Sequence, residues 1–287
     1  MRKWNLFPNI TFRKVNQVII NLTIPAITLD KISQLEMEYQ YLVPTLSGWI
    51  LFVLGGIFFA VLAKIFNWDR KTWAALTIGC GLGNTSFVGY PVTEMIFGSA
   101  GLKYAIFIDQ PGTFACLSTL GIAVAAYGSS QNLTVKSMIW KLLTFPAFPC
   151  FFIALLIPSQ YFHLNVLDDT SLLDIFSFIG GWTNPLAFLS IGMQFTLSFL
   201  DIDKKQFAWG LIFKMALAPL VFLLAFRSLG WTGMIYDVTI IEVAMPPMIT
   251  ASIIAMDYKL NPKLSMTLVN YGMPLSAITL YLWNVVL

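Results

Sequence analysis

Two short stretches inside apolar segments carry residue types that could bind a small ligand. The first, "GNTSFVGYP", ends at Pro91 and lies within the apolar run Trp73–Phe97. The second, "MPP", covers residues 245–247 and lies within the run Val238–Met256. Proline lacks a backbone N–H and frees carbonyl groups one turn earlier, so both runs are predicted to be interrupted helices. Interrupted backbone is tolerated at membrane depth only where it is buried in protein or lines a cavity.

If the two interrupted segments cross, their half-helix N-termini aim positive partial charge at a shared point, which suits a carboxylate. Hydroxyl and amide side chains beside the interruptions can donate further hydrogen bonds. A pair of packing kinks is the simpler alternative, but it is less favoured because both interruptions occupy corresponding positions. The residues predicted to contact a ligand are Asn84, Thr85, Ser86, Gly89, Pro91, Met245, Pro246, Pro247 and Thr250.

Four ionisable residues also fall inside apolar segments: Glu94, Asp109, Lys214 and Glu242. Ionisable residues at membrane depth are rare and are candidates for coupling or binding. A carboxylate near a helix end can instead reach the interface, and a lysine can extend toward it or form a structural ion pair. Three carboxylates without an evident sodium cage favour a proton-linked or uncoupled process, with Asp109 as the preferred proton carrier.

Enzymatic chemistry finds little support in the chain. Asp109 and Glu242 could form an intramembrane aspartyl pair, but no Gly-x-Gly-Asp-like motif surrounds either residue. His163 is the single histidine, which excludes a histidine-based triad or a multi-histidine metal site inside the membrane. The sequence also has no phosphate-binding loop pattern and no C-x-x-C spacing. We therefore expect no enzyme activity, no cofactor and no metal.

The elements that carry these residues are predicted to cross a membrane. Of 287 residues, 57% are hydrophobic and 11% are charged, which is more apolar surface than one soluble core can bury. The apolar runs are near the roughly 20 residues that a spanning helix needs, and they lack the alternation of a barrel strand. The predicted fold class is all-α, with nine transmembrane helices. These are Val15–Ile32, Pro44–Phe66, Trp73–Phe97, Tyr104–Tyr127, Met138–Pro158, Leu172–Leu200, Phe207–Ser228, Val238–Met256 and Leu264–Leu287.

Lysine and arginine residues predict the orientation, because they are enriched in cytoplasmic loops. One alternating set of loops contains most of them, and the other set contains only Lys31, Lys103 and Arg227. We therefore expect a multi-pass protein of a plasma membrane or bacterial inner membrane, with a cytoplasmic N-terminus and an external C-terminus. The basic residues form no cluster interleaved with aromatics, so no nucleic-acid partner is expected.

Prolines within the spans indicate an internal duplication, because three pairs recur in the same order about 160 residues apart. The pairs are Pro25 with Pro185, Pro91 with Pro246, and Pro111 with Pro274. The predicted topology makes the two repeats inverted, a pattern typical of secondary transporters with a site at the midplane.

The duplication predicts the domain organisation. An N-terminal repeat of four spans covers residues 1–127, a short cytoplasmic linker covers 128–137, and a C-terminal repeat of five spans covers 138–287. The same offset leaves Met138–Pro158 without a counterpart. We therefore expect that the first helix of a ten-helix arrangement is missing, either as a natural nine-span variant or through loss of an N-terminal segment.

Three segments carry a family resemblance that extends over nearly the whole chain: "GNTSFVGYPVTEMIFG", "VAMPPMITASIIAMDYKLNPKLS" and "LTIPAITLDKI". They resemble the auxin efflux carrier family, which includes bacterial permeases and the plant PIN carriers. The resemblance implies two inverted five-helix repeats, a scaffold half and a transport half, and elevator-like export of organic anions. It also implies a crossing at the substrate site, which here involves Asn84, Gly89, Pro91 and Pro246. The short linker makes the chain more similar to the bacterial permeases.

The sequence thus favours a secondary active efflux permease for small organic anions, either simple carboxylates or auxin-like molecules. A sodium-coupled symporter of the bile-acid type remains an alternative, as does a receptor or scaffold that transports nothing. The expected partners are the organic anion and the lipid bilayer, with a homodimer left open.

Overall fold

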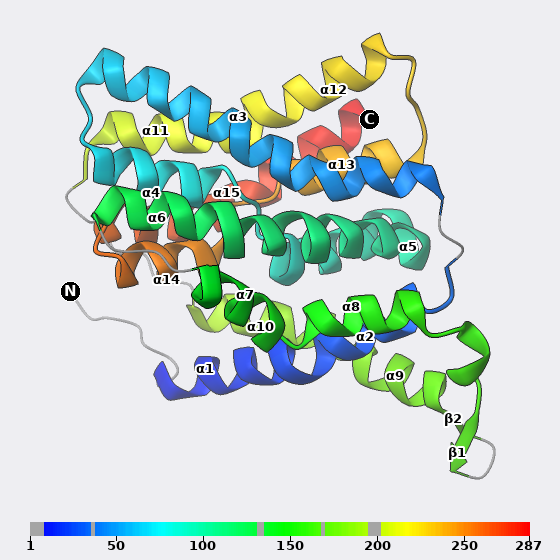
Figure 1. Cartoon of the computed structure of the whole chain (residues 1–287). Helices are drawn as coiled ribbons and strands as arrows, with labels where there is room; N and C mark the ends of the chain where they lie inside the picture. Colours follow the sequence, from blue (N-terminus) through cyan, green and yellow to red (C-terminus); the bar gives the residue numbers. More distant parts are fainter. Residues whose placement is uncertain (1–8, 36–37, 131–134, 168–169, 195–201) are drawn as a thin grey trace.

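The computed structural model describes residues 9–35, 38–130, 135–167, 170–194 and 202–287, and nearly all of its regular structure is helical (Figure 1). The α-helices are α1 (Asn9–Val18), α2 (Ile24–Ile32), α3 (Leu42–Phe66), α4 (Arg70–Cys80), α5 (Tyr90–Phe107), α6 (Ile122–Ser129), α7 (Val135–Thr144), α8 (Ala147–Leu156), α9 (Leu172–Gly181), α10 (Thr183–Gln194), α11 (Lys204–Ile212), α12 (Ala218–Ser228), α13 (Met234–Val243), α14 (Ile249–Asp257) and α15 (Pro262–Val286). Five π-helical turns are η1 (Ile19–Thr23), η3 (Thr85–Gly89), η4 (Ile108–Phe114), η5 (Leu117–Gly121) and η7 (Phe213–Leu217), and two 3-10 turns are η2 (Tyr39–Tyr41) and η6 (Ser159–Tyr161).

A short antiparallel hairpin lies between α8 and α9. It is formed by β1 (Asn165–Leu167) and β2 (Thr170–Ser171). The all-α prediction did not include it, because two or three residues per strand give too short a pattern to distinguish from a loop.

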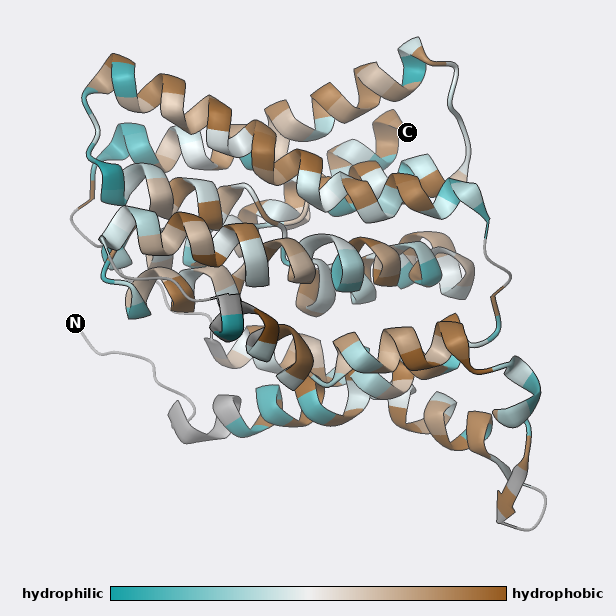
Figure 2. Ribbon diagram, viewed as in Figure 1, coloured by the Kyte–Doolittle hydropathy of each residue, from teal (hydrophilic) through white to brown (hydrophobic). Residues whose placement is uncertain are grey.

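Hydrophobic residues occur along most of the helices, including those at the edges of the molecule (Figure 2). On α3, for example, Ile57, Val61 and Ile65 are each more than half exposed, as lipid contact requires. Within the described residues, four continuous helical stretches are long and apolar enough to cross a membrane: Tyr39–Phe66, Thr85–Ser129, Leu172–Met193 and Lys204–Ser228. The protein is therefore a helical, multi-span membrane protein. The count of nine spans stays a prediction, because several of the predicted spans are divided into shorter helices.

The stretch Thr85–Ser129 contains two helical segments joined at Gly98. Gly98 has a φ of 68° and a ψ of −170°, a conformation that favours glycine. The kink falls between the predicted spans Trp73–Phe97 and Tyr104–Tyr127, where the sequence analysis placed a connection.

The helices are arranged in layers (Figure 1). In the lower part of the view α2 packs against α8 and α9, and α1 packs against α10. In the upper part α3 packs against α4 and α13. Helix α5 lies between the two parts, where Leu102 and Ile106 share a buried cluster with Ile24 and Ile27 of the lower layer. The segments that contain the two interruptions, α4–α5 and α13–α14, therefore belong to the upper and middle parts.

The mid-span prolines affect their helices in different ways. Pro25 follows the π-helical turn η1, and Pro111 lies inside the π-helical turn η4. Pro185 lies in the first turn of α10, whereas Pro274 leaves α15 continuous. A proline therefore marks a local change in hydrogen bonding in some of these spans, but not in every one.

The turn η4 is held against α3 by a close backbone approach. A Cβ on Gly48 would lie 2.8 Å from the backbone nitrogen of Thr113, and a Cβ on Gly112 would lie 2.9 Å from the carbonyl oxygen of Thr45. The indole of Trp49 donates to the carbonyl oxygen of Pro111 at 2.9 Å, which satisfies an acceptor within η4. Both glycines are thus needed because backbone, rather than a movable side chain, fills the space.

We expect Gly48→Ala to destabilise the protein by about 1–3 kcal/mol, because the added methyl group has to displace the backbone of η4. Gly56→Ala on the same helix is the matched control, since its Cβ would meet only the Thr77 methyl group at 3.5 Å. Thermal unfolding of the purified variants in detergent measures the difference. Equal melting temperatures for the two variants would contradict this account of the α3–η4 contact.

Candidate functional site

The first interruption separates α4 from η3 and is entirely buried. Helix α4 ends at Cys80, and regular helix resumes only with Thr85. Each residue from Gly81 to Pro91 is buried. The carbonyl oxygen of Asn84 accepts from the backbone N–H groups of Val88 and Gly89, at 3.3 and 3.0 Å, so Asn84 begins the second half of this span.

The second interruption separates α13 from α14. Helix α13 ends at Val243, and α14 begins at Ile249. Met245, Pro246 and Pro247 lie in the buried segment between them. Two consecutive prolines remove two N–H donors, which prevents the helix from continuing through this segment.

The two interruptions are in direct backbone contact, although about 160 residues separate them in the sequence. Gly83 and Pro247 form an isolated antiparallel bridge, and the N–H of Asn84 donates to the carbonyl oxygen of Pro246 at 2.9 Å. A Cβ on Gly83 would lie only 3.1 Å from the carbonyl oxygen of Glu242, so the absence of a side chain permits the approach. We call the two interrupted segments, Gly81–Asn84 and Ala244–Met248, the crossing.

Hydroxyl groups beside the crossing are bonded to Asp109, which is 1% exposed. Its Oδ1 accepts from Thr85 at 2.5 Å and from Ser86 at 2.9 Å. Its Oδ2 accepts from Tyr90 at 2.9 Å and from the amide of Gln110 at 2.7 Å. This carboxylate therefore connects the start of the first half-helix to η4.

Glu242, near the end of α13, is also 1% exposed. Its Oε1 accepts from the hydroxyl of Thr93 at 2.7 Å, whereas its buried Oε2 has no hydrogen-bond partner among the described residues. The carboxylate lies where a Cβ of Gly89 would be, so Gly89 is required to make room for it. The Nδ2 of Asn84 is buried and also lacks a partner among the described residues. The site thus contains an unused donor and an unused acceptor.

Lys214, on η7, is fully buried and donates from Nζ to the carbonyl oxygen of Val243 at 2.5 Å. A Cβ on Gly83 would lie 3.1 Å from this Nζ. The ammonium group therefore lies next to both interrupted segments rather than extending to the membrane surface.

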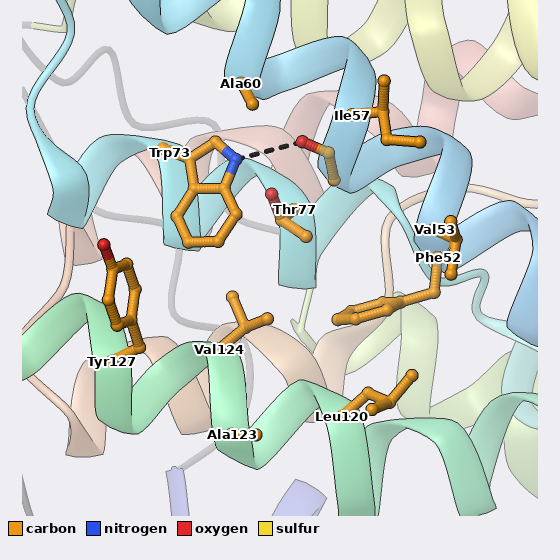
Figure 3. Close-up of a pocket in the computed structure, with 11 residues that line it drawn as sticks. Phe52, Val53, Ile57, Ala60, Trp73, Thr77, Leu120, Ala123, Val124 and Tyr127 are labelled. Carbon is orange, nitrogen blue, oxygen red and sulfur yellow. Dashed lines mark hydrogen bonds between the residues drawn. The ribbon is translucent and has the colours of Figure 1, made fainter.

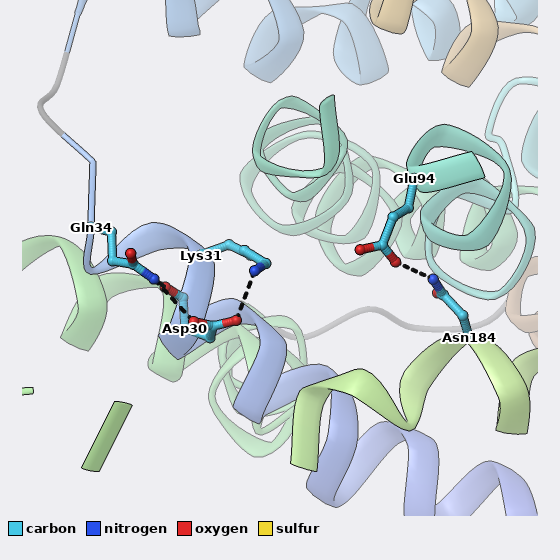
Figure 4. Close-up of polar contacts among 5 residues, drawn as sticks. All are labelled: Asp30, Lys31, Gln34, Glu94 and Asn184. Atoms are coloured by element: carbon cyan, nitrogen blue, oxygen red, sulfur yellow. Dashed lines mark hydrogen bonds and ion pairs between the residues drawn. The ribbon is translucent and has the colours of Figure 1, made fainter. Parts of the chain in front are cut away.

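Glu94 lies apart from this group. Its carboxylate accepts from the side-chain amide of Asn184, at the start of α10 (Figure 4). Figure 4 also shows the ion pair of Asp30 with Lys31, at 2.9 Å, on α2. Glu94 thus connects α5 to the lower layer and takes no part in the hydrogen bonds around Asp109.

Four of the predicted ligand residues lie in the crossing: Asn84, Met245, Pro246 and Pro247. Thr85 and Ser86 follow it directly, and Gly89 contacts Glu242. Pro91 lies in the first turn of α5, and Thr250 is half-buried in the first turn of α14. Sequence reasoning missed Tyr90, Thr93 and Gln110, which bond the two buried carboxylates. Their positions contain a signal, because Tyr90 lies between Gly89 and Pro91, and Gln110 follows Asp109. Uncharged polar residues are common enough in spans that this signal alone identifies no site.

A separate cavity of about 500 Å³ lies between α3, α4 and α6 (Figure 3). Its lining is mostly apolar and includes the exposed side chains of Val53, Ile57 and Tyr127. The indole of Trp73 donates to the carbonyl oxygen of Gly56 at 3.1 Å, so its polar atom is satisfied. This cavity has the character of a surface in contact with lipid chains, and it lacks the charged groups of the crossing.

Buried, interrupted helices with ionisable side chains at their contact are characteristic of membrane transporters. Residues 1–284 match the family described as Membrane transport protein, and the chain belongs to this family, which contains the auxin efflux carriers. The chain is thus a membrane transporter and not an enzyme.

Three relatives are similar over 95% of this chain. An uncharacterized transporter of Methanothermobacter thermautotrophicus is 28% identical over 284 residues, which cover 88% of its length. An uncharacterized transporter of Methanocaldococcus jannaschii is 25% identical over 281 residues and 89% of its length. The auxin efflux carrier component 5 of Arabidopsis thaliana is 22% identical over 315 residues and 87% of its length.

The contact between Gly89 and Glu242 can be tested with a double-mutant cycle. We expect Gly89→Ala alone to lower the melting temperature, because the new methyl group overlaps the Glu242 carboxylate. The same change should cost less in a Glu242→Ala background, with a coupling energy of about 1–3 kcal/mol. Gly79→Ala is the control, since nothing lies within 4 Å of its Cβ. Additive effects of the two substitutions would show that the contact is not made.

Proposed function

We propose that this protein is a secondary active transporter that exports small organic anions, either simple carboxylates or auxin-like molecules. One observation carries the proposal: the crossing combines the N-terminal ends of η3 and α14 with the amide of Asn84, which has no partner among the residues that the structure describes. An amide N–H and the positive ends of helices are suited to bind a carboxylate. The name of the Arabidopsis relative also supports an auxin-like anion.

We further propose that the anion contacts Asn84, Thr85, Ser86 and Thr250, while Gly89, Pro91 and residues 245–247 shape the backbone around it. The crossing would move as part of a transport half made of α3–α6 and α11–α15, and α1, α2 and α7–α10 would form the scaffold half. The close packing of α2 against α8 and α9 supports a scaffold that keeps its shape. The two inverted repeats, a cytoplasmic N-terminus and an external C-terminus remain part of this proposal.

Asp109 provides a physical route to proton coupling. When its carboxylate is ionised, the hydroxyls of Thr85 and Ser86 donate to it, so their hydrogens point away from an anion at the crossing. A protonated Asp109 can donate to one of these hydroxyls instead, which frees that hydroxyl hydrogen for the anion. Binding of a proton would therefore favour binding of an organic anion. The two would leave the cell together when the concentration gradient of the anion is directed outward. Glu94, Glu242 and Lys214 remain further candidates for coupling.

Asn84→Ala is expected to reduce anion transport at least tenfold while membrane expression stays normal, because it removes the unpartnered donor. Transport is measured with radiolabelled indole-3-acetate and benzoate in proteoliposomes. Asn284→Ala, an equivalent truncation at an exposed position of α15, serves as the control. Normal transport by Asn84→Ala would show that the site is wrongly assigned. Absence of flux for every anion tested with the wild type would favour a receptor or scaffold.

Asp109→Asn is expected to make anion transport independent of pH between about pH 5 and pH 8. The side-chain amide of the variant can donate to a hydroxyl at every pH. In the wild type, the Asp109 carboxyl can donate only when it is protonated. The wild type should transport faster as the pH of the loading side falls. Asp257→Asn, at an exposed position of α14, should keep the wild-type profile. A wild-type flux that follows sodium and ignores pH would refute this coupling and favour the symporter alternative.

A further inference from the structure

The ammonium group of Lys214 lies at the negative end of a half-helix. Helix α13 ends at Val243, and its terminal carbonyl accepts the hydrogen bond from Nζ. The carbonyl groups at the last turn of a helix carry negative partial charge and lack partners within the helix. A cation at this position is therefore favoured by the backbone itself, independently of any carboxylate.

The same group also faces the other interruption. Its Nζ is close to Gly83, where the first segment pairs with Pro247. Among the described residues the one ion pair within 4 Å is that of Asp30 and Lys31, so Lys214 has no carboxylate in direct contact. The residue before Val243 is Glu242, whose carboxylate accepts a hydrogen bond from Thr93. The backbone of the crossing therefore fixes the position of the ammonium group, and one carboxylate lies nearby.

Lys214 lies in an irregular part of its helix, and the surrounding residues support this geometry. Lys214 lies in the π-helical turn η7, and π-helical turns are frequent at functional sites. The indole of Trp283 on α15 donates to the carbonyl oxygen of Met215 at 2.8 Å, which satisfies an acceptor within the turn. The neighbouring side chains Phe213 and Met215 are buried, so the lysine extends from an apolar cluster into the crossing.

We propose that the Lys214 ammonium is a built-in cation, which occupies the place where sodium-coupled carriers with interrupted helices bind sodium. In such carriers unwound carbonyls and the C-terminal ends of half-helices coordinate the ion. The protein therefore needs no sodium, and removal of the lysine side chain creates a sodium site. This inference deepens the proposed function and relies on it only for the flux measurement described last.

The first measurement is the thermal unfolding of purified protein in sodium chloride and in choline chloride of equal ionic strength. The wild type should melt at the same temperature in both salts. Lys214→Ala should melt lower in choline and gain on the order of 3 °C in about 0.2 M sodium, because an ion that binds only the folded state stabilises it. Propylammonium, which replaces the missing atoms, should give a similar gain.

Lys214→Met is the matched control, since it fills the space without a charge and should respond to neither cation. If Lys214→Ala does not fold, Lys214→Gln is measured instead, because it leaves a neutral acceptor in the site. A sodium-specific gain in the wild type would overturn the proposal. A folded Lys214→Ala or Lys214→Gln protein that responds to neither sodium nor propylammonium would overturn it as well.

The second measurement is anion flux in proteoliposomes with and without sodium. Wild-type flux should be unchanged by sodium, whereas flux by Lys214→Ala should rise at least threefold when sodium is added. Sodium-stimulated flux in the wild type would contradict the proposal. If no variant transports any anion, the proposed function fails, while the unfolding measurements still decide whether Lys214 occupies a cation site.

Discussion

The backbone contact between the two interruptions is the constraint on which the rest of the site depends. An unpaired backbone group in hydrocarbon costs several kcal/mol, so an interrupted span has to find its partners within the protein. Here the N–H of Asn84 pairs with the carbonyl of Pro246, which lies in the segment between α13 and α14. Two glycines leave space for this pairing: Gly83 lies inside the crossing, and Gly272 packs against the ring of Pro247. Each interrupted segment therefore supplies a hydrogen-bond partner for the other.

The contact also determines where charge can be buried. Asp109 is bonded by residues at the start of the first half-helix, and Lys214 by the last carbonyl of α13. Lys214 uses a backbone carbonyl that the end of α13 leaves free, whereas Asp109 uses side-chain hydroxyls beside the first interruption. Burial of an ionised group is costly unless hydrogen bonds replace its water, and the interruptions supply those bonds. Loss of the crossing would therefore remove hydrogen bonds that compensate for the burial of Asp109 and Lys214.

The interruptions could be predicted from sequence, because glycine and proline inside an apolar run have a direct effect on helix hydrogen bonding. Asp109, Glu242 and Lys214 could be selected as ionisable residues in spans, but their partners could not be predicted. Thr93 and Glu242, for example, are 149 residues apart in the chain and meet only through packing of α5 against α13. The position of Lys214 depends on η7, since one extra residue in a turn rotates every side chain after it. Pro219, four residues after Met215, indicates an irregular turn in the sequence, but it does not predict the direction of Lys214.

The backbone contact at the crossing limits how the proposed carrier can move. Because backbone hydrogen bonds join the two interrupted segments, opening the site by separating them would leave unpaired groups at membrane depth. Movement of the crossing as one body against the lower layer avoids this cost. Such movement has to exchange contacts between the layers, among them the bond from Asn184 to Glu94. Under the proposed mechanism Glu94 is a contact between the two halves rather than a ligand of the anion, which accounts for its position in α5 away from the crossing.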